Sequence, residues 1–225
     1  MPLKNLKIIR LKKKPSTFHE GNFYLLCKRL ARKDRDLKQI LKKHGYPPMW
    51  TRPADFSTLI LTILEQQVSL ASAYAAFKKL NEKIKKVTPE NILVLTDAEL
   101  KACYFSRQKI VYARELANAV KNNQLNLDQL SFATEDEVRY ELKKIKGIGD
   151  WTADVYLMHA LQRTDLFPLG DIALVNSLKE IKQLPHHITK EEMLAIAEPW
   201  RPYRTIASMI LWHAYIIKRN IKIES

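Results

Sequence analysis

The chain has 225 residues and a net charge of +14, with 38 lysine and arginine residues against 24 acidic residues. Its length allows one or two domains, and few glycines with many Leu, Ile, Ala and Lys residues favour a helical protein. Two cysteines, Cys27 and Cys103, are too few for a zinc cluster or a four-thiolate iron–sulfur site. No apolar run approaches the ~20 residues that span a membrane, and the N-terminus lacks the apolar core of a signal peptide.

The positive charge is concentrated near the N-terminus. Residues 1–45 hold 14 basic and three acidic residues, a net charge of +11, whereas the rest of the chain contributes only +3. Residues 1–17 alternate basic and apolar side chains, which fits either a short edge strand or a mobile arm. We treat them as a basic arm ahead of a domain at 18–225. The charge fits a solvated surface or a surface that binds phosphates, and alone it does not decide between the two.

Helical periodicity begins after the arm. Apolar residues at helical spacing outline two helices between Phe23 and Leu41, and a Pro-Pro pair after Tyr46 breaks the pattern. Helix N-termini are marked by a Thr-Pro pair and three Thr-x-x-Glu capping boxes, which start at Thr88, Thr96, Thr134 and Thr189. Further helices are expected near 55–67, 70–80, 107–121, 136–145, 150–161, 172–181 and 202–218. The sequence therefore predicts an all-α protein of roughly ten short helices in an orthogonal fold.

Three of the five glycines lie between Gly147 and Gly170, directly before a carboxylate at Asp171. Gly147-Ile-Gly149 can form a tight hairpin between two helices, because glycine tolerates positive φ and lets a foreign backbone approach closely. The amides that open the second helix are unpaired and carry partial positive charge, which suits a phosphate. The segment predicts a backbone clamp for phosphate with a single carboxylate one helix further on.

The sequence Gly147-Ile-Gly-Asp-Trp-Thr-Ala153 followed by Asp171 resembles the helix-hairpin-helix DNA glycosylases, and within them the 3-methyladenine DNA glycosylase II branch. Three further segments match that branch in order: Ile63-Leu-Glu-Gln-Gln-Val-Ser69, Phe105-Ser-Arg-Gln-Lys109 with Leu116-Ala117, and Trp200-Arg-Pro-Tyr-Arg204 with Leu211-Trp212. The resemblance covers about residues 20–218. It implies two helical lobes around a cleft: a middle lobe of about 70–180 with the hairpin, and a lobe built from the N- and C-terminal segments.

Asp171 is the catalytic residue that the resemblance implies. Cleavage of an N-glycosidic bond develops positive charge on the sugar, which a carboxylate can stabilise while it orients the attacking water. An ordinary helix N-cap is the alternative interpretation, and both can hold at once. Trp151 stands where related enzymes that also cut the strand have a lysine. The resemblance therefore implies a monofunctional glycosylase without lyase activity.

The base pocket is expected to hold several aromatic side chains. Trp151 is its first wall, and Trp212 and Tyr203 are further candidates, although helix packing explains each of these two equally well. An aromatic wall suits an alkylated purine because alkylation makes the base cationic. Val155 stands where a subset of the family has a tyrosine, which leaves the substrate range open. Gln66 is also placed near the cleft, with a role in tying two helices together as its alternative.

The phosphate clamp is expected to consist of Gly147, Ile148, Gly149 and Thr152. The resemblance also implies a Na⁺ or K⁺ ion held by backbone carbonyls near Ile145 and Ile148. Arg107 is placed where the family has the wedge that fills the gap left by a flipped base, with a phosphate contact as the alternative. Ser106, Lys109 and Lys146 are assigned to the same DNA-binding surface.

Together these features predict an enzyme that flips alkylated bases such as 3-methyladenine or 7-methylguanine out of damaged double-stranded DNA and hydrolyses the glycosidic bond. Two alternatives remain: a glycosylase for deaminated bases such as hypoxanthine or uracil, and a non-catalytic DNA-binding module. We expect no required cofactor, no membrane partner and a monomer. The expected location is intracellular, at the nucleoid or in the cytoplasm of a prokaryote or in the nucleus of a eukaryote.

Overall fold

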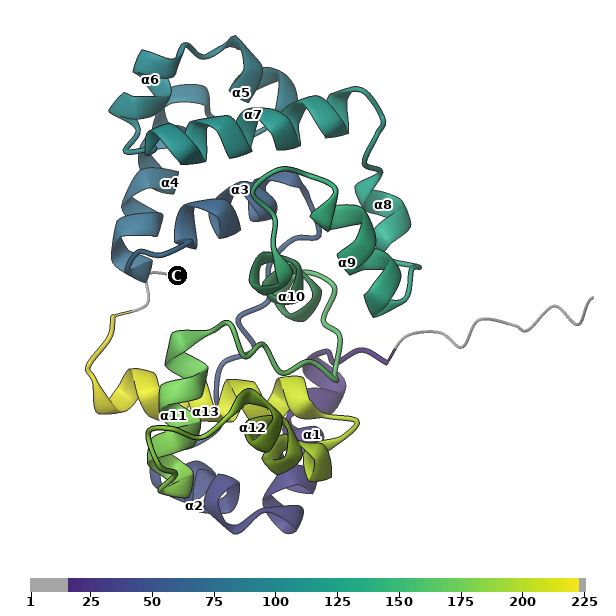
Figure 1. Cartoon of the computed structure of the whole chain (residues 1–225), viewed down its shortest axis with the longest axis vertical. Helices are drawn as coiled ribbons and strands as arrows, with labels where there is room; N and C mark the ends of the chain where they lie inside the picture. Colours follow the sequence, from purple (N-terminus) through teal and green to yellow (C-terminus); the bar gives the residue numbers. More distant parts are fainter. Residues whose placement is uncertain (1–15, 223–225) are drawn as a thin grey trace, which may run out of the picture.

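The computed structural model describes residues 16–222, and these are almost wholly helical (Figure 1). Within this range the only β-structure is an isolated bridge between Thr17 and Arg163. The helices in chain order are α1 (Glu20–Lys33), α2 (Arg35–His44), α3 (Phe56–Glu65), α4 (Leu70–Ile84), α5 (Pro89–Val94), α6 (Asp97–Ala102), α7 (Arg107–Lys121), α8 (Leu127–Leu130), α9 (Glu135–Lys143), α10 (Asp150–His159), α11 (Ile172–Lys182), α12 (Lys190–Ala197), the short 3-10 helix η1 (Glu198–Trp200) and α13 (Arg204–Lys218). The predicted all-α class is confirmed.

Local capping signals fix where many of these helices begin. The side chains of Thr96, Thr134 and Thr189 each accept from the backbone of the glutamate three residues later, and that glutamate bonds back to the threonine amide. All three predicted capping boxes are therefore confirmed. Ser106 caps a helix that covers 107–121, as expected from the sequence. Such boxes satisfy amides that a helix N-terminus otherwise leaves unpaired.

The helix α3 forms the centre of the middle part of the molecule. Every residue of α3 except Ser57 is buried, and the helix packs against α4, α7 and α10. This explains its almost wholly apolar sequence, because a helix covered on all sides has no polar face.

The helices pack in two groups, which Figure 1 shows as its upper and lower halves with α10 between them. The middle group consists of α3 to α10, and the terminal group of α1, α2, α11, α12, η1 and α13. The expected lobe boundaries at about 70 and 180 stay a prediction, and the helix packing suggests where each would fall. The apolar helix α3 packs with the middle group, whereas α11 packs on α13 and belongs with the termini.

The number of helices exceeds the expectation of roughly ten, because several have only four to six residues. The four-residue α8, capped by Asn126, is too short to show helical periodicity in the sequence. The expected arm at 1–17 lies mostly outside the described residues. Its last two residues are held to the fold: Thr17 pairs with Arg163, and the Thr164 amide donates to the Ser16 carbonyl. No helix in the described range has the length and apolarity to span a bilayer.

Candidate active site and DNA-binding hairpin

The turn between α9 and α10 is a tight hairpin that depends on one glycine. The Ile148 amide donates to the Ile145 carbonyl at 3.1 Å, and Gly147 has φ of +93°. A Cβ built on Gly147 would lie 2.1 Å from the Cγ of Tyr112, which packs against the turn from α7. Glycine is therefore required here by both conformation and space. Sequence reasoning missed Tyr112, which no local pattern distinguishes from a core residue.

Gly149 has the opposite environment. It is the N-cap of α10 with an ordinary extended backbone, and a Cβ placed on it would meet no atom within 4 Å. No side chain caps the helix, and Gly149 and Asp150 are exposed, so its first amides are left without a side-chain partner, as a phosphate site at a helix N-terminus requires. The charge of Asp150, which would oppose an anion there, is paired with Lys143 at 2.6 Å. Lys146, within the turn, is exposed.

Gln66 braces the hairpin from behind. Its Nε2 donates to the Gly147 carbonyl at 2.9 Å and to the Thr152 hydroxyl at 3.0 Å. Thr152 is buried, so its hydroxyl faces the brace instead of a ligand. The structure thus places Gln66 between α3 and α10, in the helix-tying arrangement that was its alternative. The carbonyls of Ile145 and Ile148, expected to hold a monovalent ion, lie in the same turn.

Asp171 brings together three helices. As the N-cap of α11, its Oδ1 accepts from the Leu174 amide at 2.8 Å. The same oxygen accepts from Trp212 Nε1 of α13 at 3.0 Å, and Oδ2 accepts from Trp151 Nε1 of α10 at 3.1 Å. Gly170 keeps this arrangement compact, since a Cβ there would lie 3.3 Å from the Cβ of Trp151. The Asp171 side chain is therefore both the N-cap of α11 and the carboxylate that the two indoles bind.

The geometry of this cluster suits the stabilisation of a developing cation. The carboxylate is half-buried, and two indole N–H groups and one amide fix its orientation. The same two indoles bring large aromatic rings next to the carboxylate. A positively charged base or sugar would therefore meet both an anion and electron-rich rings.

The remaining pocket candidates lie at different distances from this cluster. Val155 is buried one helical turn after Trp151. Tyr203 caps α13 nine residues before Trp212, about 13 Å along the helix, and its hydroxyl accepts from Arg29 at 3.0 Å. The structure thus brings Trp151, Trp212 and Asp171 together and leaves Tyr203 in the packing of the terminal group.

A buried histidine lies next to the cluster, and sequence reasoning missed it. His159, the last residue of α10, stacks on Trp212 with ring centroids 5.6 Å apart and planes 25° apart. Burial, reinforced by the nearby positive charge of Arg52, lowers its pKa to about 3. Its sequence context gives no signal, because neither its spacing nor its neighbours match a metal or catalytic motif. No cluster of metal-ligating side chains occurs in the range that the structure describes.

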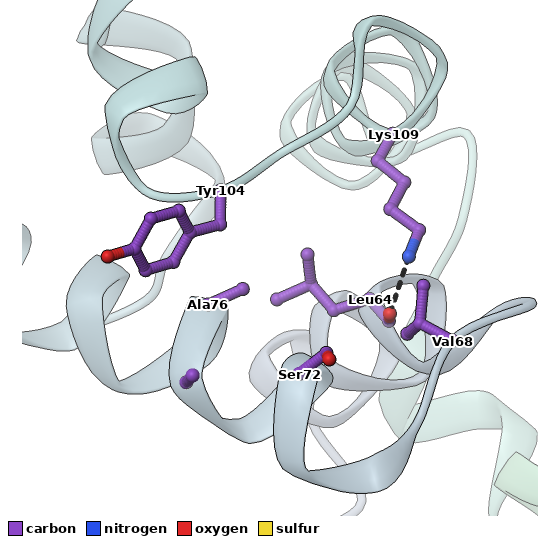
Figure 2. A pocket seen from close by; sticks show the side chains of 7 residues that line it. Leu64, Val68, Ser72, Ala76, Tyr104 and Lys109 are labelled. Atoms are coloured by element: carbon purple, nitrogen blue, oxygen red, sulfur yellow. Dashed lines mark hydrogen bonds between the residues drawn. The ribbon is translucent and has the colours of Figure 1, made fainter.

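The start of α7 borders a pocket. Lys109 Nζ donates to the Leu64 carbonyl at 2.6 Å, and partial burial lowers the pKa of this amine. A pocket of about 310 Å³ opens here, lined by Leu64, Val68, Ser72, Ala75, Ala76, Tyr104 and Lys109. Figure 2 shows Lys109 reaching from α7 to Leu64, with Tyr104 and Val68 on opposite sides. Lys109 is thereby a cap for α3, whereas Arg107, at the first position of α7, is exposed.

Tyr104 has an unusual conformation for an exposed aromatic residue. Its φ is +64°, a region that bulky residues rarely adopt, and the residue is 62% exposed. Lys79 Nζ lies 4.4 Å from the ring centroid and donates to the hydroxyl at 3.1 Å. No residue of the Asp171 cluster or of the hairpin lines this pocket, so it is separate from both.

Comparison with known proteins gives a consistent family signal. Residues 60–202 match the model of the HhH-GPD superfamily base excision DNA repair protein. A putative DNA-3-methyladenine glycosylase, YfjP of Bacillus subtilis, is 30% identical over 79% of this chain and 65% of its own length. The alkylbase DNA glycosidase-like protein mag2 of Schizosaccharomyces pombe is 30% identical over 82% of this chain and 90% of its own length. The chain spans less than two thirds of the two Bacillus subtilis relatives it matches, at 65% and 57% of their lengths.

Solved structures give the same result. The S. pombe 3-methyladenine DNA glycosylase Mag1, in complex with abasic DNA, superposes with a TM-score of 0.75 at 27% identity, covering 84% of this chain and 95% of that one. A DNA-3-methyladenine glycosidase from Bacillus halodurans gives 0.71 at 28% identity, covering 88% and 93%. An 8-oxoguanine glycosylase/lyase from Clostridium acetobutylicum gives 0.75 at 16% identity, over 91% of this chain and 78% of that one, which shows likeness of fold alone.

Proposed function

Because the chain belongs to the HhH-GPD superfamily of base excision DNA repair proteins, we propose that it is a monofunctional DNA glycosylase for alkylated bases. Its substrates are 3-methyladenine and 7-methylguanine types of lesion in double-stranded DNA, and its products are the free base and an abasic site. The observation that carries this proposal is the Asp171 carboxylate held by Trp151 and Trp212 one helix beyond an open hairpin.

The hairpin accounts for DNA binding. The uncapped amides of α10 bind a backbone phosphate, and the open space at Gly149 allows that phosphate to approach. The brace from Gln66 keeps the turn rigid, because it fixes both the Gly147 carbonyl and Thr152. A Na⁺ or K⁺ ion at the carbonyls of Ile145 and Ile148 is part of this proposal. The Ile145 carbonyl accepts one hydrogen bond and keeps a second lone pair for such an ion.

The Asp171 cluster accounts for the chemistry. An alkylated purine carries positive charge, so the glycosidic bond breaks with its electron pair leaving to the base, which becomes neutral. The positive charge passes to the sugar, where the Asp171 carboxylate stabilises it. A water then bonds to C1′ and gives up its proton to solvent or the carboxylate. A cationic base needs little acid assistance as a leaving group, which agrees with a site that offers a single carboxylate.

The absence of lyase activity follows from the residue at the hairpin. Trp151 has no amine with which to form a Schiff base, and Lys109 is committed to the Leu64 carbonyl. Borohydride should therefore trap no covalent complex with DNA, and strand breaks should appear only after alkali or heat. A trapped adduct would show that another amine reacts with the sugar.

The decisive experiment is mass analysis of bases released from methylated, deaminated and undamaged duplexes. In parallel, Asp171→Asn removes the charge and keeps the capping oxygen, so excision should fall by several orders of magnitude with the fold intact. Asp136→Asn, a change at an exposed carboxylate of α9, is the matched control and should excise normally. Release of hypoxanthine or uracil in place of methylated bases would favour the deaminated-base alternative. Damage-specific binding with no release from any duplex would favour a non-catalytic module.

The site of action is part of the same proposal. A repair glycosylase acts where DNA is, which is the nucleoid or cytoplasm of a prokaryotic cell or the nucleus of a eukaryotic one. The expected monomeric state is likewise proposed, and sedimentation of the protein with and without DNA tests it.

A further inference from the structure

His159 is held from two sides by the segment that enters α3. Its Nδ1 lies 2.9 Å from the Trp50 carbonyl, and its own carbonyl accepts from the Arg52 amide at 2.8 Å. A carbonyl can only accept, so Nδ1 carries the proton and the ring plane is fixed by this hydrogen bond. The guanidinium of Arg52 is in turn paired with Glu65 at 2.6 Å. The imidazole therefore has a defined orientation deep within the protein.

This fixed ring lies against one of the two indoles that hold the carboxylate. The planes of His159 and Trp212 are stacked, and Trp212 Nε1 donates to Asp171 Oδ1 at 3.0 Å. A chain of contacts thus runs from Trp50 through the imidazole and the indole to Asp171. The imidazole belongs to α10 and the indole to α13, so the stack also joins the two helix groups.

We propose that His159 is a positioning residue for Asp171, acting through Trp212. The imidazole holds the indole in the plane in which its N–H reaches the carboxylate, and it does so without touching DNA. This inference rests on the proposed function for its effect on rate. Simple space filling does not require a histidine, because burying a polar ring is costly unless its polar atoms are bonded. Here the hydrogen bond to Trp50 supplies both that compensation and the orientation.

The charge of the ring agrees with this role. Burial and Arg52 lower the pKa of His159 to about 3, so the imidazole is neutral at neutral pH. A neutral ring can stack on the indole without placing a positive charge near the Asp171 carboxylate. The neighbouring charges, Arg52 and Glu65, are paired with each other.

The test is a double-mutant cycle measured as single-turnover excision at saturating enzyme. His159→Leu should lower the rate about tenfold in the wild-type background and less than about twofold in a Trp212→Phe background, the size expected for coupled neighbours. His159→Phe keeps the stack, loses the bond to Trp50 and should give an intermediate rate. His187→Leu is the control, since His187 is an exposed histidine in the loop between α11 and α12, outside this chain of contacts. It should leave the rate unchanged.

A second measurement does not depend on activity. The chain has four tryptophans, so ¹⁵N-indole spectra give one N–H signal for each. His159→Leu should shift the Trp212 signal and speed its exchange with solvent, while the signal of Trp200, whose N–H bonds Asp34, stays in place. Equal rate losses in both backgrounds, or an unmoved Trp212 signal, would overturn the inference. If the wild type releases no base, the proposed function fails, and the spectra still decide whether His159 controls Trp212.

Discussion

A Cβ atom on Gly147 would lie 2.1 Å from Cγ of Tyr112, well inside the contact distance of two carbon atoms. Tyr112 lies in α7, one turn after Lys109, and its ring packs against the hairpin turn at Gly147. The hairpin is thus shaped by a residue 35 positions earlier in the chain as well as by its own glycines. The two glycines of the motif consequently have different physical roles.

Replacing Gly147 with alanine should destabilise the protein and weaken DNA binding together. A non-glycine residue at φ of +93° costs about 1–2 kcal/mol, and displacement of the Tyr112 ring adds to it. Gly149→Ala is the matched control for stability. Its backbone is extended and its Cβ would meet nothing, so the unfolding free energy should change by no more than about 0.5 kcal/mol. DNA affinity should still fall, because the new methyl occupies the space for phosphate. Denaturant melts measure the unfolding free energy and binding isotherms measure DNA affinity. Equal losses of unfolding free energy in the two variants would contradict the prediction.

Trp151 should matter more for cationic lesions than for neutral ones. Trp151→Leu removes both the π face and the N–H bond to Asp171, whereas Trp151→Phe removes only the bond. Because a cation–π contact is worth about 0.5–2 kcal/mol, the leucine variant should lose preference for 7-methylguanine over hypoxanthine, and the phenylalanine variant should keep it. Single-turnover rates on matched duplexes measure this. Equal losses on both lesions in the leucine variant would mean that the pocket selects by shape.

The assignment of Arg107 as the wedge can be tested by comparing it with Tyr104, a nearby exposed residue. Arg107 was expected from the sequence to fill the gap left by a flipped base, and the structure leaves it exposed. Tyr104, three residues earlier, is an exposed aromatic ring held at positive φ beside the pocket of Figure 2. If Arg107 is the wedge, Arg107→Ala should slow base flipping in a fluorescent-base assay, and Tyr104→Ala should not.

Tyr140→Ala serves as the control in that experiment, because Tyr140 is also an exposed tyrosine with a lysine over its ring, at 4.3 Å. A normal flipping rate in Arg107→Ala together with a slow one in Tyr104→Ala would show that Tyr104, and not Arg107, is the wedge.

His159 should make stability depend on pH in the acid range. Its pKa is about 3 in the folded protein and about 6.5 in an unfolded chain. Between these values the unfolded state binds more protons, so the unfolding free energy rises with pH. The stability that neutral His159 contributes is therefore lost as pH falls below about 6.5. One such group contributes a slope of up to about 1.4 kcal/mol per pH unit. His159→Phe should flatten this dependence between pH 5 and 6, as measured by denaturant melts. Parallel curves for the two proteins would contradict it.

The helix starts were predictable because their signals are local. The threonine boxes at Thr96, Thr134 and Thr189 complete their hydrogen bonds within four residues, and each was found in the sequence. Asp171 was identified as both a cap and a candidate catalytic residue from its position after the hairpin. The structure shows the cap and adds the two indole bonds.

The missed features depend on residues that are distant in sequence. Tyr112 of α7 meets Gly147 of the hairpin, and His159 of α10 meets Trp212 of α13, only in the folded chain. For Gln66 the sequence leaves both a place near the cleft and a tie between two helices open, and its amide bonds in the second way, to the hairpin. The helices that belong to each group are likewise not predictable from periodicity, because periodicity does not encode packing partners.

The chain passes from one helix group to the other at residues 45–55 and again at 160–171, and the second passage ends at Asp171. Asp171 and Trp212 belong to α11 and α13 of one group. These two helices are joined by a hydrogen bond from the Ser177 hydroxyl to the Leu211 carbonyl at 2.7 Å. Trp151 belongs to the other group. A hinge rotation between the groups would therefore preserve the bond from Trp212 and stretch the bond from Trp151. The 3.1 Å contact between Trp151 and Asp171 is therefore the bond to this carboxylate that depends on how the two groups are placed.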